Sequence, residues 1–123
     1  MNDSNINEQR WNKKERNKMS LKYTYTIKNT NNEVIFSGKF YSHRECVEAA
    51  VENKISLADA DLSGIDLSGA CLQKGNFINA SFLFAILNDV DFSYSILNGC
   101  NLKNVVSAKN LKLTEVNLTN TVI

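Results

Sequence analysis

The sequence has no proline among its 123 residues. Proline cannot donate a backbone hydrogen bond, so a chain without it is suited to long ladders of backbone pairing. The sequence also lacks any run of about 18 apolar residues, which argues against a membrane-spanning helix. Its N-terminus is polar and lacks the apolar segment of a signal peptide. We therefore expect a cytoplasmic protein with no membrane partner.

An excess of charge of either sign is also missing. The 14 basic and 13 acidic side chains give a formal net charge of +1, so we expect no direct binding to nucleic acid. There are only three cysteines, Cys46, Cys71 and Cys100, and their odd number and wide spacing fit neither a metal motif nor a disulfide framework. We expect free thiols in a reducing compartment.

Residues arranged for catalysis are not evident. The single histidine, His43, has no cysteine or carboxylate pair at ligand spacing, and we expect it to be a surface residue. Asp89 and Asp91 are close in sequence, but no base or metal ligand accompanies them. There is no glycine-rich phosphate loop. The sequence therefore predicts no enzyme activity, no cofactor and no metal.

The first part of the chain divides into a tail and a hairpin. Residues 1–20 are almost entirely polar. Such a segment buries too little apolar surface to offset its ordering entropy, so we expect a disordered tail. Residues 21–28 alternate apolar and polar side chains, which predicts a strand. Turn residues at 30–32 and a second apolar stretch at 33–41 predict a returning strand.

A helix should follow the hairpin. Ser42 precedes Glu45 by three residues, the spacing of a capping box, so the helix should begin at Ser42 and end near Asn53. We expect residues 21–54 to form one unit of a β-hairpin and an α-helix.

From residue 55 the sequence repeats every five residues, a period of neither a helix nor a strand. Two residues before each repeat centre stands a small or aliphatic side chain, from Ile55 to Cys100. Internal self-similarity at a fixed period is the signature of a solenoid. Ten successive centres are all leucine or phenylalanine: Leu57, Leu62, Leu67, Leu72, Phe77, Phe82, Leu87, Phe92, Leu97 and Leu102.

The register of this repeat slips once. Ser107 stands where the next centre is due, and one extra residue restores the pattern. We predict a one-residue bulge within residues 105–108 that locally breaks backbone pairing. Whichever register applies, one of the two adjacent valines, Val105 or Val106, would occupy the inward-facing position. The centres after the slip are Leu113, Leu118 and Ile123.

This pattern resembles the pentapeptide repeat family, whose motif is A-[D/N]-L-x-x, over residues 55–123. The resemblance implies an all-β solenoid: a right-handed quadrilateral β-helix of about 3.5 coils, with five residues on each side. Centres and the residues two before them would point inward, and coils would stack about 4.8 Å apart. The hairpin and helix of residues 21–54 would then be the N-terminal cap that a solenoid edge needs.

Apolar residues at outward positions are the candidates for a contact site. Exposed apolar patches usually mark contacts with other molecules. The alternative is that the N-terminal tail or the hairpin covers this surface. We predict that one continuous protein-binding patch is formed by Ile78, Leu83, Phe84, Ile86, Tyr94 and Ile96.

The end of the repeat is a second candidate contact. No capping segment follows it in the sequence, so apolar side chains should lie at an open end. An open end favours a tail-to-tail homodimer. The residues expected at this end are Leu113, Leu118, Val122 and Ile123.

These features favour a non-enzymatic protein-binding module. A hairpin, a helix and pentapeptide repeats also resemble small proteins of bacteriophages and prophages, which implies an inhibitor of a host defence or DNA-processing protein in the bacterial cytoplasm. One alternative is a DNA mimic that binds DNA gyrase or another topoisomerase. Such mimicry uses a strongly acidic rod, whereas residues 55–123 carry six acidic side chains and four lysines. A purely structural or assembly protein is the second alternative.

Overall fold

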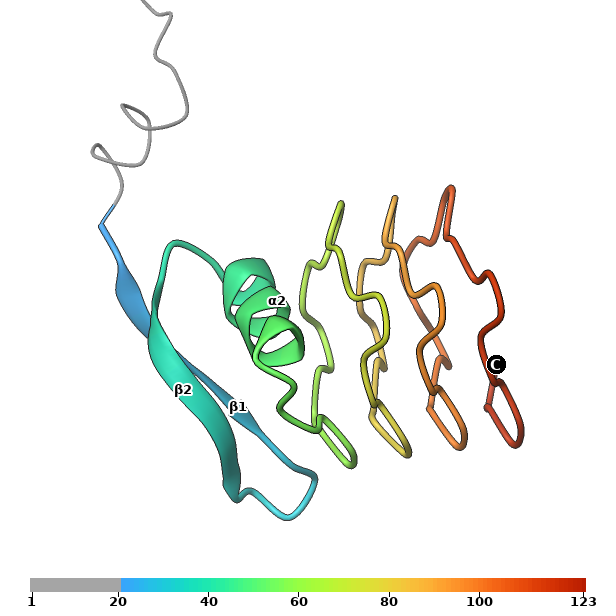
Figure 1. Ribbon diagram of the computed structural model, residues 1–123, viewed down its shortest axis with the longest axis horizontal. Helices are drawn as coiled ribbons and strands as arrows, with labels where there is room; N and C mark the ends of the chain where they lie inside the picture. The colour runs from blue at the N-terminus through green and yellow to red at the C-terminus, as the bar shows by residue number, and fades with distance from the viewer. Residues whose placement is uncertain (1–20) are drawn as a thin grey trace, which may run out of the picture.

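The computed structural model describes residues 21–123, and the tail predicted for residues 1–20 lies outside this range. The described chain begins with strand β1 (Tyr23–Lys28), strand β2 (Val34–Phe40) and helix α2 (His43–Glu52). A stack of irregular turns follows, and the hairpin and helix lie at one end of that stack (Figure 1). We refer to the hairpin and helix together as the cap.

The two strands form an antiparallel pair in which Tyr23 lies opposite Phe40. The turn between them is held by the side chain of Asn29, whose amide oxygen accepts hydrogen bonds from the amides of Asn31 and Glu33 at 2.9 Å. An asparagine side chain commonly stabilises a turn in this way. One face of the hairpin packs against helix α2, which makes contacts with both strands.

Helix α2 begins where the serine and glutamate predict it. The Ser42 hydroxyl accepts a hydrogen bond from the Glu45 amide at 3.2 Å. The Glu45 carboxylate accepts from the Tyr41 amide at 3.0 Å, one residue earlier than in a standard capping box. The helix ends at Glu52, and its inner face buries Cys46, Val47 and Ala50.

The rest of the chain is organised by parallel bridges between residues 20 apart in sequence, such as Asp61 with Ser81 and Ser81 with Asn101. These bridges form four ladders, one for each five residues of a turn. We call each 20-residue turn a coil and each ladder a side. Side 1 holds Asp61, Ser81, Asn101 and Val122; side 2 holds Asp66, Ile86 and Ser107; side 3 holds Cys71, Asp91 and Lys112; side 4 holds Asn76, Ile96 and Asn117.

The repeat centres form the core. All nine centres from Leu57 to Leu97 are at most 1% exposed, as the repeat predicts. Phe77, Phe82 and Phe92 meet in the middle, with ring centroids 5.4 to 5.7 Å apart. The cap shares this core, because Ile27 and the inner face of α2 belong to the same apolar cluster. Cap and coils are therefore stabilised together.

Backbone and side-chain hydrogen bonds join the cap to the first coil. Asn29 makes an antiparallel bridge with Ala60, and the Asp61 amide donates to the Lys28 carbonyl at 2.8 Å. On side 3 the Glu48 carboxylate of α2 accepts from the Cys71 amide at 2.9 Å. The cap thus pairs backbone groups that would otherwise lie at an open sheet edge.

The register of the ladders shifts by one on side 2. Ser81 and Asn101 are 20 residues apart, whereas Ile86 and its partner Ser107 are 21 apart. Every later bridge keeps the spacing of 21. The extra residue is Val106, which lies at a bend and is 65% exposed. This is a β-bulge, with two residues opposite one.

Two details of the slip differ from the sequence prediction. The Val106 amide donates to the Ala85 carbonyl at 2.8 Å, and the Ser107 carbonyl accepts from the Leu87 amide at 2.7 Å. Elsewhere in a ladder a single residue makes both of these hydrogen bonds. Here Val106 makes one and Ser107 makes the other, so the backbone pairing is kept and not broken. Only Val105 packs against the core, because the bulge turns Val106 outward.

Candidate functional site

Each five-residue side ends in a corner whose last residue has a positive φ. The residue equivalent to Phe84 is Gly64 in the preceding coil and Asn104 in the following coil, and both also have a positive φ. Glycine adopts this conformation without strain and asparagine tolerates it. Phe84, with a φ of 61°, and Tyr94, with a φ of 63°, are the two aromatic exceptions. A left-handed conformation costs such residues about 1–2 kcal/mol each.

Nothing in the core compensates for this strain. The side chains of Phe84 and Tyr94 are 54% and 52% exposed. The same corners of the neighbouring coils hold Gly64 and Asn104 for Phe84, and Lys74 and Glu115 for Tyr94, so the fold does not require an aromatic ring at either corner. Backbone strain that the fold does not require is concentrated at functional sites in proteins. Both rings are therefore candidates for contact with another molecule.

Phe84 lies beside the bulge. Its neighbour Ala85 accepts the hydrogen bond from Val106, and Ile86 bridges to Ser107. Four apolar side chains consequently gather at the corner between sides 1 and 2. We call this surface the bulge corner, and it consists of Leu83, Phe84, Ile86 and Val106.

Val106 is the member that the sequence does not single out. The signal for it is the pair of adjacent valines at the register slip, of which only one can occupy a single inner position. The bulge and the strained Phe84 are separate irregularities that coincide at one corner. β-Bulges are over-represented next to functional sites.

The other predicted contact residues lie elsewhere. Ile78 and Ile96 are both on side 4, and Tyr94 is at the corner between sides 3 and 4. That corner is diagonally opposite the one occupied by Phe84. The six predicted residues therefore lie on the adjoining sides 4, 1 and 2, with Phe84 and Tyr94 at opposite corners, and the single continuous patch stays a prediction. The exposed Asn79 stands between Ile78 and Leu83 along the chain.

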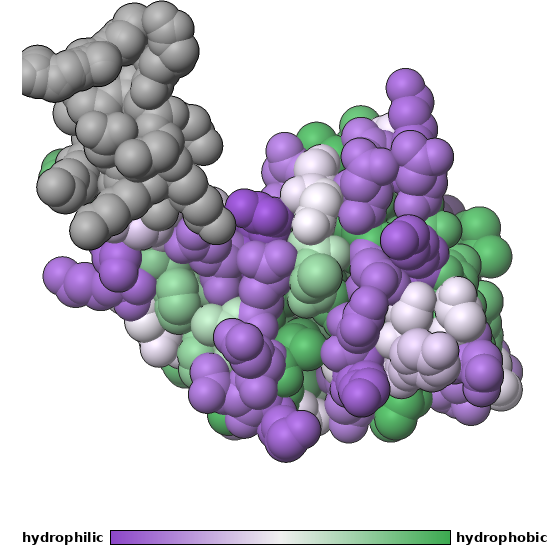
Figure 2. Space-filling view, turned by 45° about the horizontal axis from the view of Figure 1, so that its top comes forward, coloured by the Kyte–Doolittle hydropathy of each residue, from purple (hydrophilic) through white to green (hydrophobic). Residues whose placement is uncertain are grey.

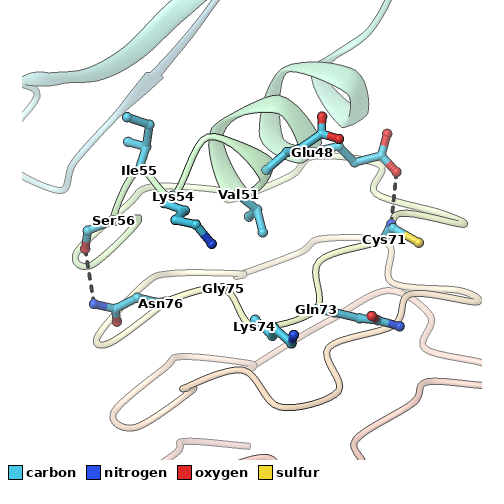
Figure 3. Close-up of a pocket in the computed structure, with 11 residues that line it drawn as sticks. Glu48, Val51, Lys54, Ile55, Ser56, Cys71, Gln73, Lys74, Gly75 and Asn76 are labelled. Atoms are coloured by element: carbon cyan, nitrogen blue, oxygen red, sulfur yellow. Dashed lines mark hydrogen bonds between the residues drawn. The ribbon is translucent and has the colours of Figure 1, made fainter.

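A polar groove of about 700 Å³ lies between helix α2 and the coils (Figure 3). It contains Lys54 and Lys74, and its walls are joined by hydrogen bonds from Cys71 to Glu48 and from Asn76 to Ser56. Within residues 21–123 no group of three or more histidine, cysteine or acidic side chains is placed to bind a metal. The groove is the seam between cap and solenoid.

Carboxylates on the solenoid surface are engaged in local hydrogen bonds. Bonds from the Ser93 side chain, the Gln73 side chain and the Ser93 amide lower the pKa of Asp91 to about 2. Bonds from the side chain and amide of Ser68 lower the pKa of Asp66. An aspartate bonded to the backbone two residues later stabilises a turn. These acidic groups therefore have a structural role at the corners.

The C-terminal end of the stack exposes apolar side chains. Leu113 and Leu118 are repeat centres, yet they are 37% and 40% exposed, and Ile123 is 93% exposed. Figure 2 shows apolar surface at the end of the molecule away from the cap. In residues 21–123 the helix is too short and too polar to cross a membrane.

A family model described as pentapeptide repeats matches residues 55–82 and 85–106, with eight copies. Residues 55–82 and 85–106 therefore carry pentapeptide repeats. The match is interrupted at Leu83 and Phe84 and ends at Val106, so the bulge corner is also where the chain departs from the pentapeptide repeat pattern. No curated protein and no solved structure matched the chain.

Proposed function

We propose that this pentapeptide repeat chain is a non-enzymatic protein-binding module that contacts its partner through the bulge corner. Pentapeptide repeat proteins are generally protein-interaction modules. The single observation that carries the proposal is Phe84, a half-exposed aromatic residue with a φ of 61° at a corner that glycine or asparagine would fill without strain.

The surroundings of Phe84 suit an anchor for binding. Leu83 and Ile86, on either side of Phe84 in the sequence, are partly buried, and a Cβ atom added at Gly64 in the preceding coil would meet no other atom within 4 Å. An aromatic side chain that enters an apolar pocket of a partner is a typical hot spot. Because the contact is apolar, binding should depend little on salt.

The detailed architecture is part of this proposal. The coils wind right-handed and have a square cross-section, with the bulge corner along one of the four edges. The four ladders of parallel bridges support this view. A rigid scaffold of this kind fixes Phe84 and Val106 relative to each other, which reduces the entropy lost on binding.

As a biological role we propose an inhibitor of a host defence or DNA-processing protein, acting in the bacterial cytoplasm. The small chain, with a hairpin-and-helix cap on pentapeptide repeats, supports this role by its resemblance to phage and prophage proteins. A gyrase-binding DNA mimic has less support, since Asp66 and Asp91 form turns and three lysines lie on the last coil. An assembly protein would use the end of the stack instead.

The test is affinity capture from a bacterial lysate with three forms of the chain. Wild type and Tyr94→Asn should retain the same partner, and Phe84→Asn should lose it. Tyr94→Asn is the matched control, because it makes the same change at the opposite corner. Capture should persist in about 0.5 M salt, where surface charge interactions are largely screened. If wild type and Phe84→Asn retrieve the same proteins, the bulge corner is not the site.

The DNA-mimic alternative has a different outcome in the same experiment. Capture that is lost at high salt and abolished by charge reversal at Asp61 and Asp66 would replace the apolar contact with an electrostatic one.

A further inference from the structure

Long side chains occupy one corner of the solenoid, the corner between sides 3 and 4. At the other three corners the positive-φ positions hold glycine, asparagine or aspartate, with Phe84 as the one exception. Residues of other types are strained in this left-handed conformation. Strain that recurs along one corner points to a use for the surface there. The positive-φ residues at this corner, each with a φ between 51° and 64°, are Lys54, Lys74, Tyr94 and Glu115.

Two of these residues, Lys54 and Lys74, line the polar groove between helix α2 and the coils. Both are exposed, and neither forms an ion pair with an acidic residue of the described chain. The end of α2 does not use their charge either, since the carbonyls of Ala49, Ala50 and Val51 already accept backbone amides. Two positive charges on strained residues are therefore available to a ligand in the groove.

A hydroxyl donor lies in the same groove. The Ser56 oxygen accepts hydrogen bonds from the Ala58 amide at 3.3 Å and from the Asn76 side chain at 3.2 Å. Within residues 21–123 the Ser56 hydroxyl donates its own proton to no acceptor. Ammonium and hydroxyl groups are donors that bind phosphate oxygens, and a charged donor makes the stronger bond. Lys54, Lys74 and Ser56 together form a set of donors suited to a phosphate group.

The other end of the groove carries acceptors. Figure 3 shows Glu48 and Cys71 at the end away from Ser56. Glu52 also lines the groove and forms no ion pair within the described residues. Carboxylates accept hydrogen bonds from hydroxyl groups and repel a phosphate, so they would orient a ligand that carries both.

The size and lining of the groove narrow the class of ligand. Its volume of about 700 Å³ is typical of a site for a small molecule and exceeds what a phosphate ion alone would fill. None of the described residues that line it is aromatic, so the groove offers no ring on which a nucleotide base could stack. Hydroxyl groups, by contrast, would find carboxylate and amide partners there.

We propose that this groove binds a phosphorylated sugar. The phosphate lies at Lys54, Lys74 and Ser56, and the sugar hydroxyls donate to the carboxylates of α2. The phosphate neutralises two positive charges, one from the end of the cap and one from the first coil. A ligand held in this way bridges the cap and the solenoid, so its binding should raise the melting temperature of the protein.

The experiment titrates the isotope-labelled full chain with glucose 6-phosphate, inorganic phosphate and glucose, followed by nuclear magnetic resonance. Glucose 6-phosphate should bind with a Kd of about 1 mM or below and shift the amide signals of Lys54, Ser56 and Lys74. Inorganic phosphate should shift the same signals at higher concentration, and glucose should leave them unchanged. Lys74→Asn should weaken binding of glucose 6-phosphate at least about tenfold, because a charged donor to the phosphate is lost.

Controls separate this proposal from general charge attraction, from folding and from the proposed function. Lys103→Asn removes the same charge from side 1 and should bind glucose 6-phosphate as the wild type does, as should Phe84→Asn. Lys74→Asn should remain folded by circular dichroism, because asparagine tolerates the left-handed conformation. It should also retain the protein partner of the bulge corner, so either proposal can fail without the other.

Three outcomes would overturn the proposal. One is the absence of shifts at Lys54 and Lys74 with glucose 6-phosphate at about 10 mM, where even weak specific binding is seen. Another is an equal loss of affinity in Lys103→Asn and Lys74→Asn, which would reveal attraction by net charge alone. The third is equal affinity for inorganic phosphate and glucose 6-phosphate, which would leave a site for the free ion only.

Discussion

The backbone amide of Val106 lies 2.8 Å from the carbonyl oxygen of Ala85. This hydrogen bond lets an extra residue enter the ladder without leaving that carbonyl unpaired. It also fixes the exposed valine next to the strained corner at Phe84, so one backbone contact joins the two irregular features of the solenoid.

Deletion of Val106 should leave the fold intact and weaken partner binding. The deletion restores a spacing of 20 residues on side 2, and the Ser107 amide can then donate to Ala85. Thermal unfolding followed by circular dichroism measures the first effect, and partner capture measures the second. As a control, deletion of the exposed Gln73 should unfold the chain, because no bulge absorbs the change and every later centre leaves the core. Unfolding of the Val106 deletion would contradict this account of the bulge.

Replacing the strained aromatic residues should stabilise the fold. Phe84→Asn and Tyr94→Asn each relieve a left-handed conformation, and we expect about 0.5–1 kcal/mol of added unfolding free energy after the loss of some apolar contact. Urea denaturation measures the change. Leu83→Asn has no such strain to relieve and should be neutral or destabilising. A loss of stability in both corner variants would show that the rings support the core.

The phenylalanine cluster should dominate the stability of the middle coil. Phe92→Ala should cost about 3–5 kcal/mol, because the ring is fully buried and its removal leaves a cavity. Phe92→Leu should cost less, since leucine fills the same position in most other coils. Urea denaturation of both variants tests the order, and an equal cost would show that the cavity collapses.

Stability should fall at acidic pH, partly through Asp91. Its folded pKa of about 2 is below the ordinary value of 3.8, so its stabilising contribution is present above pH 3.8 and is lost as the pH falls through 2. Removal of one hydrogen bond in Gln73→Ala should raise the pKa of Asp91. Titration of the carboxyl carbon by nuclear magnetic resonance measures both values. An unchanged pKa would assign the shift to Ser93 alone.

The bond from helix α2 to side 3 should protect the first coil. In Glu48→Ala the Cys71 amide loses its acceptor, which should cost about 1 kcal/mol and speed hydrogen exchange at that amide. Glu52→Ala, on the same helix and beside the same groove, should leave this exchange rate unchanged. Equal exchange in the two variants would mean that the carboxylate does not protect the amide.

The sequence predicts the repeating part of this molecule well because its signal is redundant. Ten centres spaced by five residues identify Leu57 to Leu102 as inward-facing, and a single substitution does not obscure that pattern. The Ser42–Glu45 pair likewise predicts the start of α2, because capping depends on residues that are close in sequence.

The contact surface is harder to predict because it depends on departures from the repeat. A count of four sides to a coil separates Phe84 from Tyr94, but a list of outward apolar residues does not. The position of Val106 depends on which of two adjacent residues donates to Ala85. That choice depends on local packing and backbone geometry at one site. The register slips only once in the sequence, so no other repeat shows the same irregularity.

The antiparallel bridge from Asn29 to Ala60 also gives the solenoid a mechanical direction. The first coil is held by strand pairing, by a helix and by a shared core, whereas within residues 21–123 the last coil is held on one face alone. Under a pulling force, coils would peel one after another from residue 123 toward the cap, each release exposing the next edge. Unfolding from the other end would first have to break the cap as a unit.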